Sequence, residues 1–105
     1  MQVLTLEETR AALPFGPLID ALDAGFRAGA EVPLRHHHPM VNPGAADDML
    51  LLMPAWQAAG WGGVKIVNVH PGNAGRGLPA IASSYILFDR VTGAHKLLLD
   101  GGELT

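Results

Sequence analysis

The stretch Val64-Lys65-Ile66-Val67-Asn68-Val69 carries the clearest structural signal in the chain. Its β-branched residues favour a strand, and the two-residue repeat of a strand puts Lys65 on one face with the odd-numbered valines. We therefore predict a strand over residues 61–69. A lysine in such a strand either lies at a sheet edge with its ammonium in water or is desolvated beside an anion. From the residue pattern alone, the edge position is favoured.

Strands are also predicted on both sides of this stretch. Residues 32–38 form a candidate strand stopped by Pro39, and a turn follows over residues 42–44. Residues 49–53 are apolar throughout, which is typical of a strand buried on two sides. Residues 80–88 and 96–99 flank a turn at 89–93 with Gly93 at a left-handed position, which indicates a hairpin. Gly101 and Gly102 predict one further turn.

Two helices are predicted ahead of the strands. Thr5 and Glu8 have the spacing of a capping box, so a short helix should run over residues 6–13. A second helix should begin near Pro17 and end at Gly29. Its apolar residues recur at helical spacing and are expected to face a core: Leu18, Leu22 and Phe26. The fold class is therefore α+β, with two N-terminal helices and then a mainly antiparallel sheet of about five strands.

Composition restricts the function classes. The chain has 105 residues, with seven Lys+Arg against ten Asp+Glu and a net charge of −3, which argues against a nucleic-acid binder. Hydrophobic residues make up 49%, so the chain should fold, and the absence of cysteine excludes disulfides. No apolar run is long enough to span a membrane. Glu7 and Glu8 precede the first basic residue, unlike a signal peptide, so a cytoplasmic location is expected.

Histidines 36–38 raise the possibility of a metal site. On a strand, His36 and His38 point the same way and His37 the other, so a third ligand would have to come from His70 or His95. We expect no metal site, because no glutamate follows at the spacing of a cupin. Arg35 is either a solvated residue at the strand end or a clamp for a carboxylate. The glycine-rich loop over residues 72–77 lacks the features of a P-loop or dinucleotide fingerprint and is interpreted as structural.

Six stretches taken together resemble the N-terminal part of the ornithine cyclodeaminase/mu-crystallin family. They are Ile19-Asp20-Ala21-Leu22 with Phe26-Arg27-Ala28-Gly29, Pro33-Leu34-Arg35-His36-His37-His38, Leu50-Leu51-Leu52-Met53-Pro54-Ala55-Trp56, Gly63-Val64-Lys65-Ile66-Val67-Asn68-Val69, Gly77-Leu78-Pro79-Ala80, and Leu99-Asp100-Gly101 with Leu104-Thr105. Each stretch alone is weak, but their order and spacing cover nearly the whole chain.

The resemblance implies a function. Members of this family are NAD(P)-dependent enzymes of amino acid metabolism, including ornithine cyclodeaminases, which are lyases, and ketimine reductases and alanine dehydrogenases, which are oxidoreductases. By position, Arg35 and Lys65 match the residues that hold the substrate carboxylate, and this reverses the interpretations favoured by pattern alone. Small amino acid or cyclic imine carboxylates are the implied ligands, and self-association into a homodimer or higher oligomer is also implied.

The resemblance covers only the first part of the family's proteins. We expect residues 1–105 to form a single, partial substrate-binding and dimerisation domain of a truncated chain that lacks the Rossmann domain, the family's next substrate-binding arginine and the acidic catalytic residue. The chain alone should therefore hold no NAD or NADP, contain no catalytic residue and transfer no hydride. The alternative is a stand-alone, non-catalytic module that binds small carboxylates or another partner.

Overall fold

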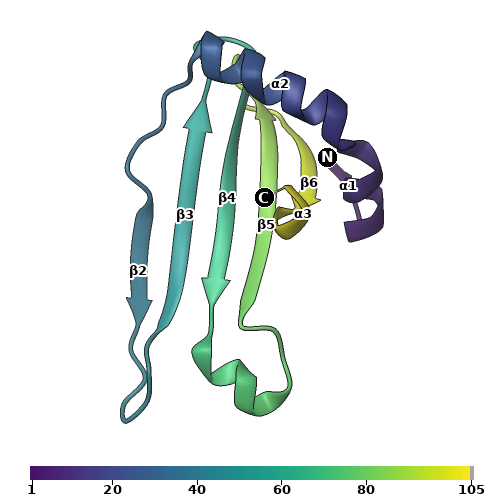
Figure 1. Cartoon of the computed structure of the whole chain (residues 1–105). Helices are drawn as coiled ribbons and strands as arrows, with labels where there is room; N and C mark the ends of the chain where they lie inside the picture. The colour runs from purple at the N-terminus through teal and green to yellow at the C-terminus, as the bar shows by residue number, and fades with distance from the viewer. Residues whose placement is uncertain (105) are drawn as a thin grey trace.

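The strands form one six-stranded sheet in the order β1-β6-β5-β4-β3-β2 (Figure 1). The computed structural model describes residues 1–104. The strands are Gln2–Val3 (β1), His36–Met40 (β2), Asp48–Trp56 (β3), Trp61–Val69 (β4), Ile81–Asp89 (β5) and His95–Asp100 (β6). Neighbouring strands are antiparallel except β1 and β6, which are parallel. The predicted α+β class and the strand over residues 61–69 are confirmed.

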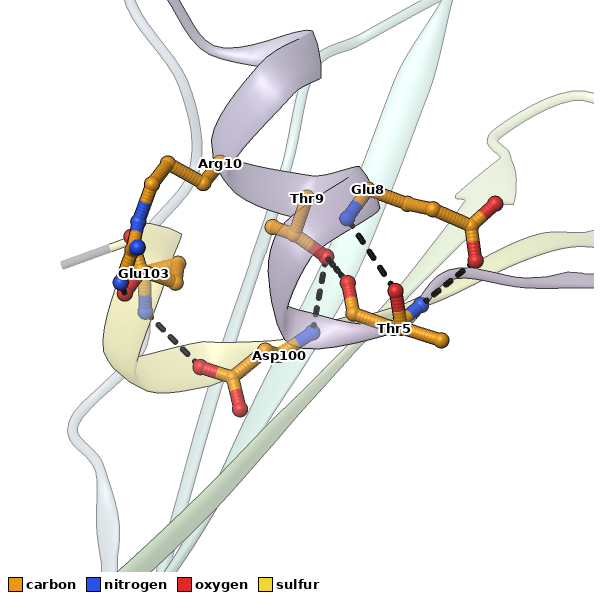
Figure 2. Close-up of polar contacts among 6 residues, drawn as sticks. All are labelled: Thr5, Glu8, Thr9, Arg10, Asp100 and Glu103. Atoms are coloured by element: carbon orange, nitrogen blue, oxygen red, sulfur yellow. Dashed lines mark hydrogen bonds and ion pairs between the residues drawn. The ribbon is translucent and has the colours of Figure 1, made fainter.

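The helices are Leu6–Ala12 (α1), Phe15–Ala28 (α2), the 3₁₀ helix Pro71–Arg76 (η1) and Gly101–Leu104 (α3). The predicted capping box starts α1: Thr5 Oγ1 accepts from the Glu8 amide at 3.1 Å, and Glu8 Oε1 accepts from the Thr5 amide at 3.2 Å (Figure 2). Helix α2 ends at Gly29, whose φ of +78° is accessible to glycine. Within residues 1–104, no helix is long and apolar enough to cross a membrane.

Two prolines lie inside strands that were predicted to stop before them. Strand β2 begins at His36 and includes Pro39, which an edge strand tolerates because one side needs no ladder hydrogen bond. Strand β3 continues through Pro54 to Trp56. The Trp56 amide donates to the Glu31 carbonyl, on the side of β3 that faces β2. Because alternate residues of a strand direct their amides to the same side, an N–H at position 54 would also face that side. The pairing of β2 with β3 ends at Leu52, before that position. The prediction that this strand is buried on both sides is wrong, because all nine residues are partly exposed.

Two short elements have no sequence signal. Strand β1 has only two residues and pairs Gln2 with Leu97 and Val3 with Leu98. The turn predicted at Gly101 and Gly102 is instead the first turn of α3. A glycine suits position 101, because a Cβ there would lie 2.9 Å from the carbonyl carbon of Ser83.

The sheet has two unlike faces. Strand alternation and register place the odd-numbered residues of β3, β4 and β5 on one face, which we call the helix face because α1 and α3 pack over its β5–β6 side. The even-numbered residues form the open face, on which neither α1 nor α3 lies. Its apolar residues include Leu50, Leu52, Pro54, Val64, Ile66, Ile86, Phe88 and Leu98.

The chain buries little of its apolar surface by itself. Val67, at 7% exposure, is the buried hydrophobic residue of the described chain, and α2 lies across one end of the sheet without substantial contact with it (Figure 1). The prediction that the α2 stripe faces a core is therefore wrong, since Phe26 is 84% exposed. The accessible surface of 7273 Å² exceeds by about 1,600 Å² the value of about 5,700 Å² expected for a compact monomer of this mass.

Candidate functional site

Lys65 occupies the middle of a central strand. Its register partners are Met53 of β3 and Tyr85 of β5, and its side chain is half-buried on the helix face. The edge-strand interpretation is wrong, because β4 has a hydrogen-bonded neighbour on each side. Withdrawing an ammonium from water is costly without a counter-charge, so this position favours an anionic partner.

Tyr85 stands next to Lys65 in the same row. Burial raises the pKa of the Tyr85 phenol, so this side chain remains a neutral hydrogen-bonding group at physiological pH. Its ring leans over Gly63 of β4, where a Cβ would come within 2.6 Å of Tyr85 Cε1 and nearer still to the hydroxyl. The close approach of ring and backbone requires the glycine. Sequence reasoning did not single out Tyr85, although its odd position in β5 could have placed it beside Lys65.

Arg35 precedes β2 directly and is exposed. Continuing the alternation of His37, which is opposite Leu51, places Arg35 on the helix face next to Met53. With that extension of the β2 alternation, Arg35 and Lys65 would share one face, two strands or about 10 Å apart at the backbone. Both side chains are long enough to reach a small anion above Met53, so the strand order allows the two predicted residues to act on one ligand.

An apolar hollow lies beside this row. Its volume is about 220 Å³. The residues that line it are Ala30, Ala55, Trp56, Gln57, Trp61, Gly62, Tyr85 and Leu87. Ala55 and Leu87 face Gly63, so the hollow begins one register row away from Lys65 and shares Tyr85 with it. Neither Trp61 nor the hollow was anticipated from the sequence.

Helix α3 is held against the sheet by α1 (Figure 2). Arg10 donates two hydrogen bonds to Glu103, from Nη2 at 2.8 Å and from Nε at 3.2 Å. These bonds from Arg10 lower the pKa of the Glu103 carboxyl and raise that of the guanidinium. The Asp100 carboxylate in turn caps α3 by accepting from the Glu103 amide at 2.9 Å.

Thr9 joins the two helices from a buried position. It is 1% exposed, and its hydroxyl donates to the Thr5 carbonyl at 2.8 Å and accepts from the Asp100 amide at 3.4 Å. Thr9→Val keeps the shape but removes the hydroxyl that bonds to the Thr5 carbonyl and the Asp100 amide, so we expect it to lower the free energy of unfolding by about 0.5–1.5 kcal/mol. Urea denaturation measures this loss. The control Thr9→Ser keeps the hydroxyl and should lose less; an equal loss in both variants would attribute the effect to the methyl group.

The histidines do not assemble a metal site. His36 and His38 share a face with their ring centroids 5.9 Å apart, as the alternation predicts. His70 instead pairs with Asp48, Nδ1 to Oδ1 at 3.4 Å, and His95 lies beside Phe88. Within residues 1–104, no group of three or more candidate ligands could hold a metal ion.

The glycine-rich loop does not form a nucleotide cradle. Residues 71–76 fold as η1, and Gly77 follows at a φ of +68° before the chain enters β5. The loop connects two antiparallel strands, whereas a dinucleotide fingerprint connects a parallel strand to a helix. This loop therefore does not have the form of a dinucleotide-binding fingerprint. The loop is tied internally, since the Asn73 amide donates to the Pro79 carbonyl at 2.9 Å.

Comparisons with known proteins agree with this arrangement. The model of the ornithine cyclodeaminase/mu-crystallin family matches residues 1–105. An uncharacterized protein of Schizosaccharomyces pombe is 43% identical over 107 residues, which is 99% of this chain and 32% of that protein. The Delta(1)-pyrroline-2-carboxylate reductase 2 of Burkholderia ambifaria is 34% identical, with 93% of this chain and 31% of the reductase covered.

A solved structure shares the fold. It is an archaeal alanine dehydrogenase dimer with bound NAD, which superposes with a TM-score of 0.77 at 30% identity and covers 95% of this chain and 31% of the dehydrogenase. The chain thus spans about a third of the length of the proteins it matches.

Proposed function

Because the chain belongs to the ornithine cyclodeaminase/mu-crystallin family, we propose that it is the substrate-binding and self-association part of an NAD(P)-dependent enzyme that acts on an α-amino acid or cyclic imine. The observation that carries the proposal is the half-buried position of Lys65 in a central strand, with Arg35 expected on the same face. Two cations that can reach one point suit a carboxylate, which accepts hydrogen bonds on both oxygens.

The role of this part is to bind the substrate and to fix its orientation. The half-buried ammonium of Lys65 holds one carboxylate oxygen, and the guanidinium of Arg35 closes on the ligand from the exposed side. When its carboxylate is held in this way, the substrate has its α-carbon at a defined place above the sheet. This positioning of the substrate lowers the activation barrier of the reaction that follows. The glycine-rich loop does not have the form of a dinucleotide fingerprint, and we propose that hydride transfer requires a separate nucleotide-binding part.

Lys65→Met tests the carboxylate site. Losing one charge-assisted hydrogen bond should weaken binding of L-proline or L-alanine about tenfold or more. Isothermal titration measures the affinity. The matched control is Lys96→Met, which removes the other lysine of the chain from an exposed position in β6. Equal affinities in Lys65→Met and the unmodified protein would contradict the assignment.

The same preparation separates an enzyme from a binding module. Saturable, Lys65-dependent binding of a carboxylate without any oxidation of NADH or NADPH in the presence of a cyclic imine would favour the non-catalytic alternative. Turnover that Lys65→Met abolishes would favour the enzyme.

The open face is the proposed surface of self-association. Its apolar residues lie on the three adjacent nine-residue strands β3, β4 and β5 and on the neighbouring β6, and the chain exposes more surface than a compact monomer. Contiguous apolar patches of this kind mark interfaces between proteins. The dimeric state of the archaeal alanine dehydrogenase supports a second copy of the same chain as the partner.

A further inference from the structure

One row of side chains crosses the open face with a basic residue at one end and an acidic residue at the other. Consecutive register pairs join its members, which are His36, Leu52, Ile66, Ser84 and Asp100. Ile66 is the middle member, and the two ends lie four strand spacings apart, or about 19 Å. The imidazole of His36 donates to a carboxylate in either protonation state and is cationic when protonated.

Both ends of this row lie at the rim of the open face. His36 is exposed in the edge strand β2, and Asp100 is the last residue of β6, beyond the pairing of β6 with β1. Asp100 Oδ1 accepts from the Glu103 amide at 2.9 Å, and within residues 1–104 its Oδ2 is left for a further donor (Figure 2). A charged pair at a rim stays partly hydrated, so it avoids much of the desolvation cost of a buried pair.

The acidic residues nearest to His36 in its own chain lie too far along β3 to pair with it. Asp48 and the residue bridged by Glu31, Trp56, are each four residues from Leu52, or about 13 Å along the strand. Asp48 also accepts from Asn42 at 2.9 Å and pairs with His70. A carboxylate for His36 would therefore have to come from another molecule.

The two neighbouring rows of the open face have no acidic residue. One row contains Pro54, Val64, Ile86 and Leu98, and the other contains His38, Leu50, Asn68 and Ala82. The charge pattern on these three rows is therefore set by the row of His36 and Asp100.

This pattern distinguishes two ways in which two copies can place their open faces together. In a two-fold interface the same patch of each copy meets the other, and packed sheets lie about 10 Å apart with their strands within about 30° of each other. An axis across the strands, along the row, places His36 opposite the partner's His36 and Asp100 opposite the partner's Asp100. An axis parallel to the strands through Ile66 reverses the row, so His36 lies opposite the partner's Asp100. Like charges facing each other disfavour the first arrangement.

We infer that a second copy of the chain packs on the open face about a two-fold axis that runs parallel to the strands through Ile66. His36 of each copy then pairs with Asp100 of the partner subunit, and Ile66 lies against the partner's Ile66. The inference rests on the proposed self-association through the open face and adds the geometry of that interface.

Chemical cross-linking tests the direction of the axis, because the chain has no cysteine of its own. In the double variant His36→Cys/Asp100→Cys, the two thiols of one copy are about 19 Å apart, so a bismaleimide of shorter reach joins only different copies. We expect this variant to give a covalent dimer on a denaturing gel and His36→Cys alone to remain a monomer. The matched control His37→Cys/Asp100→Cys moves the first thiol to the helix face and should also remain a monomer.

A charge series tests the pair without disturbing the cap of α3. His36→Asp places two acidic residues opposite each other twice in each dimer and should weaken association about tenfold or more. Asp100→Asn keeps an oxygen that can accept from the Glu103 amide but removes the charge, so adding it to His36→Asp should restore most of the affinity. Sedimentation equilibrium measures the dissociation constants.

The outcomes separate the geometry from the proposed surface. A covalent dimer from His36→Cys alone would overturn the inferred axis while leaving the open face as the interface. An unmodified protein that stays monomeric, or association that Ile66→Asp leaves unchanged, would overturn the proposed surface itself. An unchanged dissociation constant in His36→Asp would overturn the pairing even where Asp100→Cys fails to fold.

Discussion

Gly63→Val is expected to destabilise the protein by about 3 kcal/mol, near the upper end of overpacking effects. The side chain would enter the space of the Tyr85 ring, where a single Cβ already comes within 2.6 Å of a ring carbon. The ring can escape only by leaving its place beside Lys65. Thermal denaturation should show Tm lower by about 10–20 °C for a domain of this size.

Two comparisons make this prediction specific. Gly25→Ala, in a part of α2 with open space around the glycine, should instead raise stability by up to about 1 kcal/mol. In a Tyr85→Leu background, Gly63→Val should cost much less, because the clashing ring is gone. An undiminished cost in that background would show that the close approach of Tyr85 and Gly63 is not the cause.

Ile66→Asp is expected to weaken self-association about a hundredfold or more. Ile66 lies on the open face at the centre of the sheet, opposite Leu52 of β3 and Ser84 of β5. In an isolated chain an aspartate there stays hydrated, but in a dimer it is an unpaired charge buried between two apolar surfaces. Sedimentation equilibrium of the two proteins measures the difference.

The matched control is Val91→Asp. Val91 is a β-branched residue in the β5–β6 turn, is 75% exposed and lies away from the open face, so its replacement should leave association unchanged. Equal dissociation constants for Ile66→Asp and the unmodified protein would exclude the open face as the interface. Circular dichroism of both variants verifies that the strands are retained.

Local chemistry determined which parts of the fold could be predicted. The capping box of α1, the glycine turn before β6 and the alternation in β4 depend on residues close in sequence, and all three are confirmed. The bounds of β2 and β3 depend on which neighbour each strand has. Pro39 and Pro54 are tolerated in these strands because the sheet ends beside them. The residue pattern of one strand does not show which neighbours that strand has.

The candidate site also combines features that local sequence predicts with features that depend on neighbouring strands. Alternation put Lys65 on one face, and the resemblance selected both Arg35 and Lys65, but their distance across the sheet depends on the register of β2, β3 and β4. The assignment of roles to both residues stays a prediction. The Tyr85 contact and the hollow could not be derived, because they depend on how an aromatic side chain of β5 crosses to the glycines of β4.

The parallel pairing of β1 with β6 bears on the order in which the chain folds. Gln2 and Leu97 are register partners, so β1 can join the sheet only after β6, which lies near the other end of the described residues, has been made. At about 5–20 residues per second, β1 waits about 5–20 s without its partner. The β3–β4 and β4–β5 pairs close over much shorter loops and can form in that interval. Strand β1 is consequently among the last of the described strands to be fixed in the sheet.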